Sequence, residues 1–151
     1  MAMKSVTHFL DEHGVKYVVQ QHSPAYTAQE VAEAAHVPGR HFAKSVMVNV
    51  DGRLALAVLP ATDRVDLHRL AQSLGAQSVE LAEESEFSEH FPDCEPGAMP
   101  PFGNLFDLEV FVSPHLAQAD IIAFSAGNHH EVMQLAYSVF DRLVKPVEVA
   151  M

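Results

Sequence analysis

The sequence predicts a mixed α/β domain in which helices surround a largely antiparallel, barrel-like sheet. Three features support this fold class: a strong hairpin signal at Asp51-Gly52, helix-capping patterns, and strand-like apolar runs spread along the chain. Strands interspersed with short helices favour a sheet with helical decoration over a helical bundle. We expect residues 1–151 to form a single domain, since this length is sufficient to bury a core.

The N-terminal third predicts two helices and a strand. Ser5 is placed to cap a helix that ends at Gly14, and residues 15–20 have the composition of a strand. Thr27-Ala28-Gln29-Glu30 has the pattern of a capping box, in which a hydroxyl and a carboxylate satisfy backbone N–H groups at a helix start. This second helix is expected to continue to Ala35.

The Asp51-Gly52 turn fixes a predicted register between strands 43–50 and 53–59. In a two-residue turn Val50 faces Arg53, so Lys44 faces Leu59. Lys44 then shares a face with Val46, Val48 and Val50. A lysine on an apolar face is either snorkelling from the strand end or lining a cavity, and the register leaves both interpretations open.

The C-terminal half carries further predicted elements. Asp66 is expected to cap a helix ending at Gly75, and the remaining elements are predicted from apolar runs. These are a helix within 79–89, strands 105–112 and 120–125, and a closing helix 137–144.

The loop Gly97-Ala98-Met99-Pro100-Pro101-Phe102-Gly103 is a candidate binding segment. Prolines stiffen it, and a glycine at each end leaves room for close approach of the backbone. Such a loop can present N–H groups to a developing oxyanion. A structural turn is the alternative, since Pro and Gly mark turns generally.

The charge and cysteine content narrow the function classes. A net charge of −11 argues against charge-driven binding to DNA or RNA, which needs clustered Lys and Arg. The sequence contains no stretch of membrane-spanning length, so no membrane partner is expected. The lone Cys94 excludes an intramolecular disulfide and agrees with a reducing, cytoplasmic location.

Adjacent histidines, His129 and His130, raise the question of a metal site. Neighbouring residues on a strand point to opposite faces, and no Cys or carboxylate spacing completes a ligand set. We therefore expect no metal and no cofactor.

Three segments in this order resemble the YbaK/prolyl-tRNA-synthetase-associated domain family. They are Lys44 in its strand, the G-x-x-x-P-x-G loop, and Ser125-Ala126-Gly127-Asn128-His129-His130 before a final helix. Residues 26–32 and 64–67 are also similar to that family. The resemblance implies the predicted fold and an editing activity: hydrolysis of the ester of mischarged tRNA carrying a small amino acid, of the Ala- or Cys-tRNA-Pro type.

The resemblance also implies roles for individual residues. Catalysis would involve Lys44, backbone groups near Gly97 and Gly103, and His130, while the other matched residues would bind substrate. The implied substrate-binding residues are Tyr26, Thr27, Ser45, Met47, Pro101, Phe102 and Gly127.

The implied partners are a tRNA acceptor end, bound weakly and locally, and an aminoacyl-tRNA synthetase as a candidate helper. The predicted contact patch comprises Arg40, Lys44, Arg53, Arg64 and Arg69. Ser113 stands where many relatives carry aspartate, which puts full activity in question. A non-catalytic module that binds aminoacyl-tRNA, a small molecule or a protein on the same scaffold is therefore the alternative.

Overall fold

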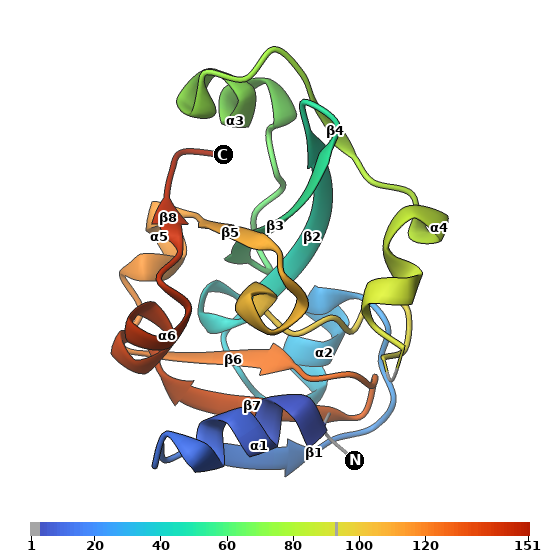
Figure 1. The fold of residues 1–151 in the computed structure, drawn as a ribbon. Coiled ribbons are helices and arrows are strands. Elements are labelled where there is room, and N and C mark those ends of the chain that lie inside the picture. Colours follow the sequence, from blue (N-terminus) through green and yellow to red (C-terminus); the bar gives the residue numbers. More distant parts are fainter. Residues whose placement is uncertain (1–3, 93) are drawn as a thin grey trace.

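The computed structural model describes residues 4–92 and 94–151, and shows the predicted mixed α and β architecture (Figure 1). A three-stranded sheet of order β1-β7-β6 lies at one end of the molecule, and a five-stranded sheet of order β4-β2-β3-β5-β8 forms the other. The elements are α1 (Lys4–Glu12), β1 (Val18–Gln21), α2 (Ala28–Ala34), η1 (Gly39–His41), β2 (Ala43–Val50), β3 (Arg53–Pro60), α3 (Leu67–Leu74), β4 (Val79–Leu81), α4 (Glu84–Phe87), η2 (Ser88–His90), η3 (Gly103–Phe106), β5 (Glu109–Val112), α5 (Pro114–Ala117), β6 (Ile121–Ser125), β7 (Glu131–Ala136), α6 (Tyr137–Val144) and β8 (Val147–Glu148).

The three-stranded sheet is antiparallel and is covered on both faces. Ile122 and Phe124 of β6 face the main core together with Leu10 of α1. Ala123, between them in sequence, faces the opposite way and packs with Val31 of α2. This alternation is the two-residue period of a strand, and it places α1 and α2 on opposite sides of the sheet (Figure 1).

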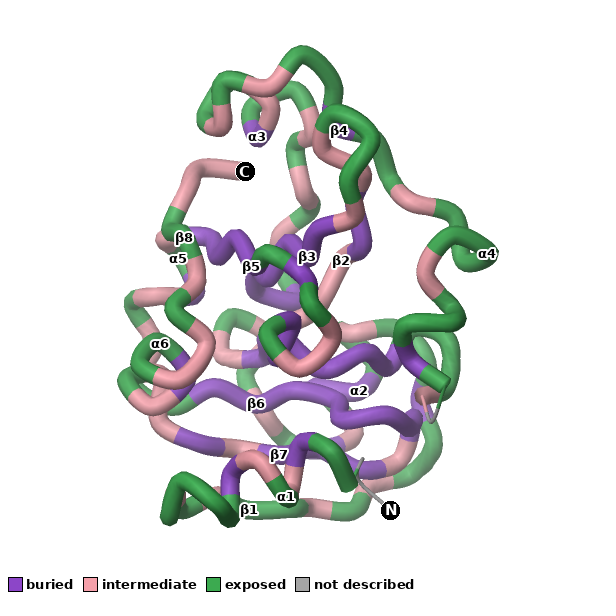
Figure 2. The backbone as a smooth tube through the Cα atoms, in the orientation of Figure 1, coloured by how far each residue is buried: buried purple, intermediate pink, exposed green. Residues whose placement is uncertain are grey.

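The five-stranded sheet is mixed. β2 pairs antiparallel with β3 and β4, whereas β3–β5 and β5–β8 are parallel. One face contributes Met47, Leu56 and Val110 to the core that it shares with the three-stranded sheet. The other face is covered by α3, whose Leu70 is fully buried. Figure 2 shows the buried backbone concentrated in β6, β7 and the central strands of this sheet.

The predicted hairpin register is confirmed. Val50 pairs with Arg53 and Lys44 pairs with Leu59. Asp51 and Gly52 both take positive φ values, 49° and 86°, as a tight two-residue hairpin requires. The Asp51 carboxylate also accepts hydrogen bonds from the backbone N–H groups of Gln77 and Ser78, which ties the turn to the segment after α3.

Two of the three predicted N-caps are confirmed. The third is wrong, because Ser5 lies inside α1 (Lys4–Glu12) and is not its cap. Thr27 and Glu30 form the complete capping box of α2. Asp66 caps α3, and Gly75 ends that helix in the left-handed region at φ 65°. The closing helix spans the predicted residues, Tyr137–Val144.

Three predicted elements are wrong in part. The first strand, predicted over residues 15–20, is Val18–Gln21. Residues 79–81 form strand β4 rather than the start of a helix, because they pair with residues 48–50 of the hairpin. Only Glu84–Phe87 is α-helical in that region. Residues 103–106 form a 3-10 turn, and strand β5 begins only at Glu109, since Asp107 takes a left-handed conformation between them.

Candidate functional site

A cavity of about 190 Å³ opens where the two sheets meet. The sheets are joined here by a single bridge between Phe42 and Ala123, so the start of β2 lies beside β6. The loop after Cys94 closes the same space. The lining residues are Ala28, Phe42, Ala43, Lys44, Ser45, Gly97, Met99 and Ser125. The structure therefore brings together predicted site residues from two distant segments, Lys44 and Ser45 of β2 and Gly97 of the proline-rich loop. We call this space the site cavity.

Lys44 is the second residue of strand β2 and is half-buried. Its Nζ donates a hydrogen bond to the backbone carbonyl of Asp63, in the segment that follows β3. Burial lowers the pKa of Lys44 below its ordinary value, while the Asp63 carboxylate raises it and Arg64 lowers it. An ammonium anchored by a carbonyl at the cavity wall is oriented and can still donate its remaining hydrogens.

The loop that carries Gly97 is held by backbone hydrogen bonds to the β6–β7 connection. Glu95 N–H donates to Gly127 O at 2.8 Å, and Gly127 N–H donates to Ala98 O at 2.8 Å. Both Gly97 and Gly127 have positive φ, 85° and 103°, which explains the glycines. Among the described residues, the Gly97 N–H has no hydrogen-bond acceptor. A free N–H at a cavity wall is the type of donor that binds an oxyanion.

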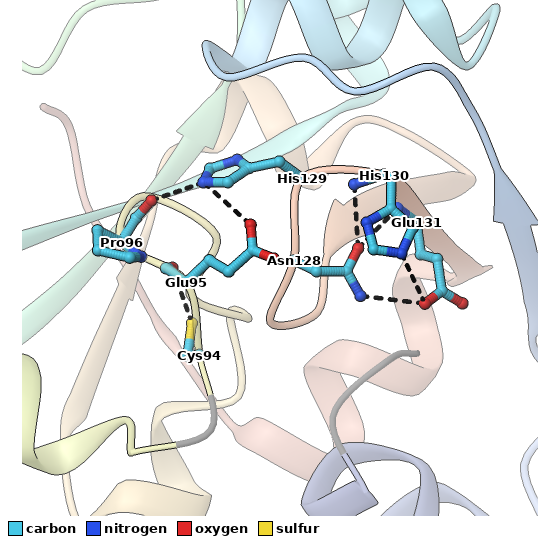
Figure 3. Close-up of polar contacts among 7 residues, drawn as sticks. All are labelled: Cys94, Glu95, Pro96, Asn128, His129, His130 and Glu131. Carbon is cyan, nitrogen blue, oxygen red and sulfur yellow. Dashed lines mark hydrogen bonds and ion pairs between the residues drawn. The ribbon is translucent and has the colours of Figure 1, made fainter.

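His129 supports this loop from the β6–β7 connection (Figure 3). Its Nε2 lies 2.7 Å from Pro96 O and 3.8 Å from a Glu95 carboxylate oxygen. Its ring also stacks at a tilt on Tyr26, with 5.0 Å between ring centroids. His129 is buried, and its contact with Pro96 O ties the residue before Gly97 to the β6–β7 connection.

His130 points away from His129 at the bend between β6 and β7 (Figure 3). Its Nε2 lies 3.7 Å from a Glu131 carboxylate oxygen, and it does not line the site cavity. Asn128 organises this turn: its Oδ1 accepts from the His130 and Glu131 N–H groups, and its Nδ2 donates to Glu131 Oε1. Burial raises the pKa of Glu131, but hydrogen bonds, among them that from Asn128, outweigh burial and leave this pKa below its ordinary value.

Several predicted substrate-binding residues are placed in supporting positions. Thr27 is the N-cap of α2 and directly precedes Ala28 of the cavity wall. Tyr26 is 70% exposed beside His129. Met47 is buried in the main core and lies two residues beyond Ser45 on strand β2.

The far end of the predicted loop lies in the core rather than in the cavity. Phe102 is fully buried and forms ring contacts with Phe124 and Phe140. Pro101 and Gly103 are buried beside it. The structure gives these residues a packing position, because the chain turns inward after Met99.

Several residues at the site were given no individual role from the sequence, although Ser125 and Met99 belong to segments named there. Asp63, which anchors Lys44, lies in a polar connection without a recognisable motif. Ser125 and Met99 line the cavity, yet each is typical of an ordinary strand or loop residue. Ser113 is buried and caps α5 through its Oγ, which accepts from the His115 N–H at 3.2 Å. Aspartate performs the same capping function, so the serine is compatible with the fold.

Within residues 4–92 and 94–151, no group of three or more His, Cys, Asp or Glu side chains is arranged to hold a metal ion. The helices found in the same residues are all too short or too polar to cross a bilayer.

The fold and the site cavity define an aminoacyl-tRNA editing domain. Residues 22–143 match the family of that description, and the chain belongs to it.

Individual relatives agree with this assignment. The chain is 30% identical to the multifunctional Ser/Thr-tRNA deacylase ProXp-y of Escherichia coli K12, over 97% of this chain and 93% of the relative. It is 25% identical to the prolyl-tRNA editing protein ProX of Acetoanaerobium sticklandii, over 95% and 91% of the two chains. The family thus includes proteins named as hydrolases of aminoacyl-tRNA esters.

Solved structures show the same fold. The hypothetical protein APE2540 superposes with a TM-score of 0.85 at 17% identity, over 97% of this chain and 98% of the other. A candidate trans-editing enzyme for prolyl-tRNA synthetase superposes with a TM-score of 0.80 at 20% identity, over 97% and 94% of the two chains.

Proposed function

We propose that this protein is an aminoacyl-tRNA deacylase that removes a small, wrongly attached amino acid from tRNA. The observation that carries the proposal is the site cavity, which is lined by both the half-buried Lys44 of β2 and the left-handed Gly97 of the loop. Family membership supplies the substrate class, an ester between an amino acid and the terminal ribose of tRNA.

The proposed reaction is addition of water to the ester carbonyl. The new C–O bond places negative charge on the former carbonyl oxygen, and in this proposal the Gly97 N–H, at the cavity wall, stabilises that charge. The ester C–O bond then breaks, and the ribose oxygen takes the proton lost by the water. Free amino acid and uncharged tRNA are the products.

Lys44 would orient the substrate or stabilise the anionic intermediate through its ammonium. Neither role needs a neutral amine, so the lowered pKa of Lys44 does not limit it. A cysteine nucleophile is unsupported, because burial raises the pKa of Cys94 to about 12 and the thiol stays protonated at neutral pH.

The resemblance seen in the sequence implies alanine or cysteine as the amino acid removed. Ser45 favours a more specific choice. It lines the cavity, yet its Oγ is buried and finds no hydrogen-bond partner among residues 4–92 and 94–151. A substrate hydroxyl would satisfy it, so we propose preference for serine or threonine over alanine and cysteine.

The test is a deacylation panel with tRNA charged with alanine, cysteine, serine, threonine or proline. Catalytic amounts of protein are expected to discharge many equivalents of at least one small-residue species. Lys44→Ala should lower kcat/KM by about 100-fold or more, the loss typical of a removed oxyanion donor. Lys16→Ala is the matched control, because Lys16 is an exposed lysine outside the site cavity.

Flat traces for every tRNA, or only stoichiometric binding, would contradict the deacylase and leave a binding module. Full activity of Lys44→Ala would remove the lysine from the mechanism. For selectivity, Ser45→Ala should lower the serine-to-alanine ratio of kcat/KM by about tenfold, the value of one hydrogen bond to a substrate hydroxyl. An unchanged ratio would contradict the role of Ser45.

A further inference from the structure

A second hollow, of about 180 Å³, lies between η1 and α5 and is lined mostly by basic side chains. Its lining residues are Arg40, His41, His115, Gln118 and Ala119, and none of them is acidic. This is unusual in a chain with nine Lys and Arg residues and 20 Asp and Glu residues. We call it the basic hollow.

The basic hollow adjoins the site cavity along the chain. Arg40 and His41 belong to η1, which leads directly into Phe42, Ala43 and Lys44 of the cavity wall. The turn is fixed by backbone hydrogen bonds: Ala61 N–H donates to Gly39 O at 3.1 Å and to Phe42 O at 2.9 Å. The backbone that carries Arg40 and His41 is therefore held at a set position relative to Lys44.

Asp63 connects the two spaces more directly. Its backbone carbonyl accepts from Lys44 Nζ, and its carboxylate Oδ2 lies 2.8 Å from His115 Nδ1. This contact orients the His115 ring and leaves Nε2 available. A carboxylate on Nδ1 and a second anion on Nε2 are both satisfied when the ring is protonated on both nitrogens.

We propose that the basic hollow binds a backbone phosphate of the tRNA acceptor strand. Arg40 offers a planar fork of donors that matches phosphate oxygens, and His115 Nε2 and the Gln118 amide add further donors. This inference rests on the proposed function, which places the ester at the end of an RNA strand. The nearest phosphodiester is attached to the 5′ oxygen of the reacting ribose, so it must lie close to the mouth of the site cavity.

In this proposal, the basic hollow provides the local positive charge with which a chain of net charge −11 binds RNA. Only part of the predicted cationic patch lies at the site. Arg53 pairs with Val50 beside the hairpin turn, six residues along β3 from the partner of Lys44. At the rise of a strand this separates the two by about 20 Å. Binding would therefore depend on few phosphate contacts and be weak.

The decisive experiment compares two substrates that share the ester but differ in phosphate. One is the aminoacyl-tRNA that the wild-type protein discharges, and the other is the same amino acid esterified to adenosine, which has no phosphodiester. Arg40→Gln is expected to lower kcat/KM about tenfold on the tRNA and to leave hydrolysis of the aminoacyl-adenosine unchanged. His115→Gln should show the same selective loss.

Arg53→Gln is the matched control, because it removes the same charge from an exposed position beside the hairpin turn. It should leave both substrates unaffected. Salt dependence provides a second readout: the slope of log(kcat/KM) against log[salt] should become shallower by about 0.7 to 1 in Arg40→Gln, the value of one phosphate contact. Thermal melting of each variant confirms that the fold is retained.

The outcomes separate this inference from the proposed function. Equal losses on both substrates, or an unchanged salt slope in Arg40→Gln, would overturn the phosphate site while deacylation stands. An equal effect of Arg53→Gln would show that overall charge, not the basic hollow, is responsible. A wild-type protein that discharges no aminoacyl-tRNA would instead overturn the proposed function itself.

Discussion

The two glycines of the loop from Gly97 to Gly103 look equivalent in sequence and differ in the structure. Gly97 has φ 85° and lines the site cavity, and a Cβ added to it would lie 3.6 Å from His129 Cε1, an ordinary contact. Gly103 has no unusual φ, but a Cβ there would lie 2.5 Å from Val110 Cγ2 and 3.0 Å from Leu108 O. One glycine is required by backbone conformation and the other by packing.

This difference shows how the loop serves two purposes over seven residues. Its first part borders the site cavity and is held by Gly127 and His129. Its last part fastens the loop to the core through Phe102, which packs against strands and helices from both halves of the chain. A rigid anchor close to a binding segment limits the positions that its N–H groups can take.

The largest effect is expected for the anchor. Phe102→Ala should lower the free energy of unfolding by about 3–5 kcal/mol, because it removes a fully buried ring and leaves a cavity. Chemical denaturation would measure this loss. The kcat/KM of the molecules that remain folded should fall by a much smaller factor than the equilibrium constant for folding. A near-neutral effect on unfolding would contradict the core position of this residue.

Gly103→Ala should cost about 1–3 kcal/mol through overpacking. The clash with Val110 is with a side chain, but Leu108 O is backbone and cannot move without disturbing η3 and β5. Val110→Ala makes room at the first contact only, so Gly103→Ala in that background should recover part of the loss. Strict additivity of the two substitutions would argue against a direct clash.

Local signals explain why much of the fold was predictable. The Asp51-Gly52 turn, the capping box at Thr27 and the cap at Asp66 each act over a few residues, and each was confirmed. The errors arose where distant pairing decides. Residues 79–81 have no intrinsic strand signal strong enough to identify them, and become β4 because the hairpin edge offers hydrogen bonds.

The site was only partly predictable for the same reason. The hairpin register placed Lys44 at a strand end, and the structure puts it at the site cavity with Gly97. The Asp63 carbonyl that anchors the lysine belongs to the backbone, so no residue type could signal it. Likewise, a glycine required by φ and a glycine required by packing are the same letter in a sequence.

Gly97→Ala sharpens the comparison from the other end of the loop. Adding a Cβ at φ 85° should cost about 1 kcal/mol of stability, since no close atom is met. Activity should fall further, by about tenfold, because relief of the strain moves an oxyanion donor. Gly14→Ala is the matched control: φ is 64°, an added Cβ would meet no atom of the described residues within 4 Å, and Gly14 does not line the site cavity. Equal activity of both variants would contradict a role for the Gly97 backbone.

The smallest effect is expected just before the loop, at Cys94. Burial, with a smaller contribution from Glu95, raises the pKa of this thiol from 9.0 to about 12. Its folded-state pKa lies above the unfolded value, so its contribution to stability is complete below pH 9 and is lost between pH 9 and 12. Cys94→Ala should therefore leave the pH dependence of unfolding unchanged at neutral pH and flatten it only above pH 9.

Thiol chemistry checks the same point independently. At pH 8 the native protein should react with iodoacetamide far more slowly than the urea-unfolded chain, because the thiolate is the nucleophile. The deacylation rate of the fully alkylated protein would show whether activity tolerates a larger side chain at position 94. Rapid alkylation of the native protein at pH 8 would show that Cys94 is ionised and exposed. In that case the loop would be held less firmly at its start than at Phe102, and the contrast between its two ends would extend beyond the glycines.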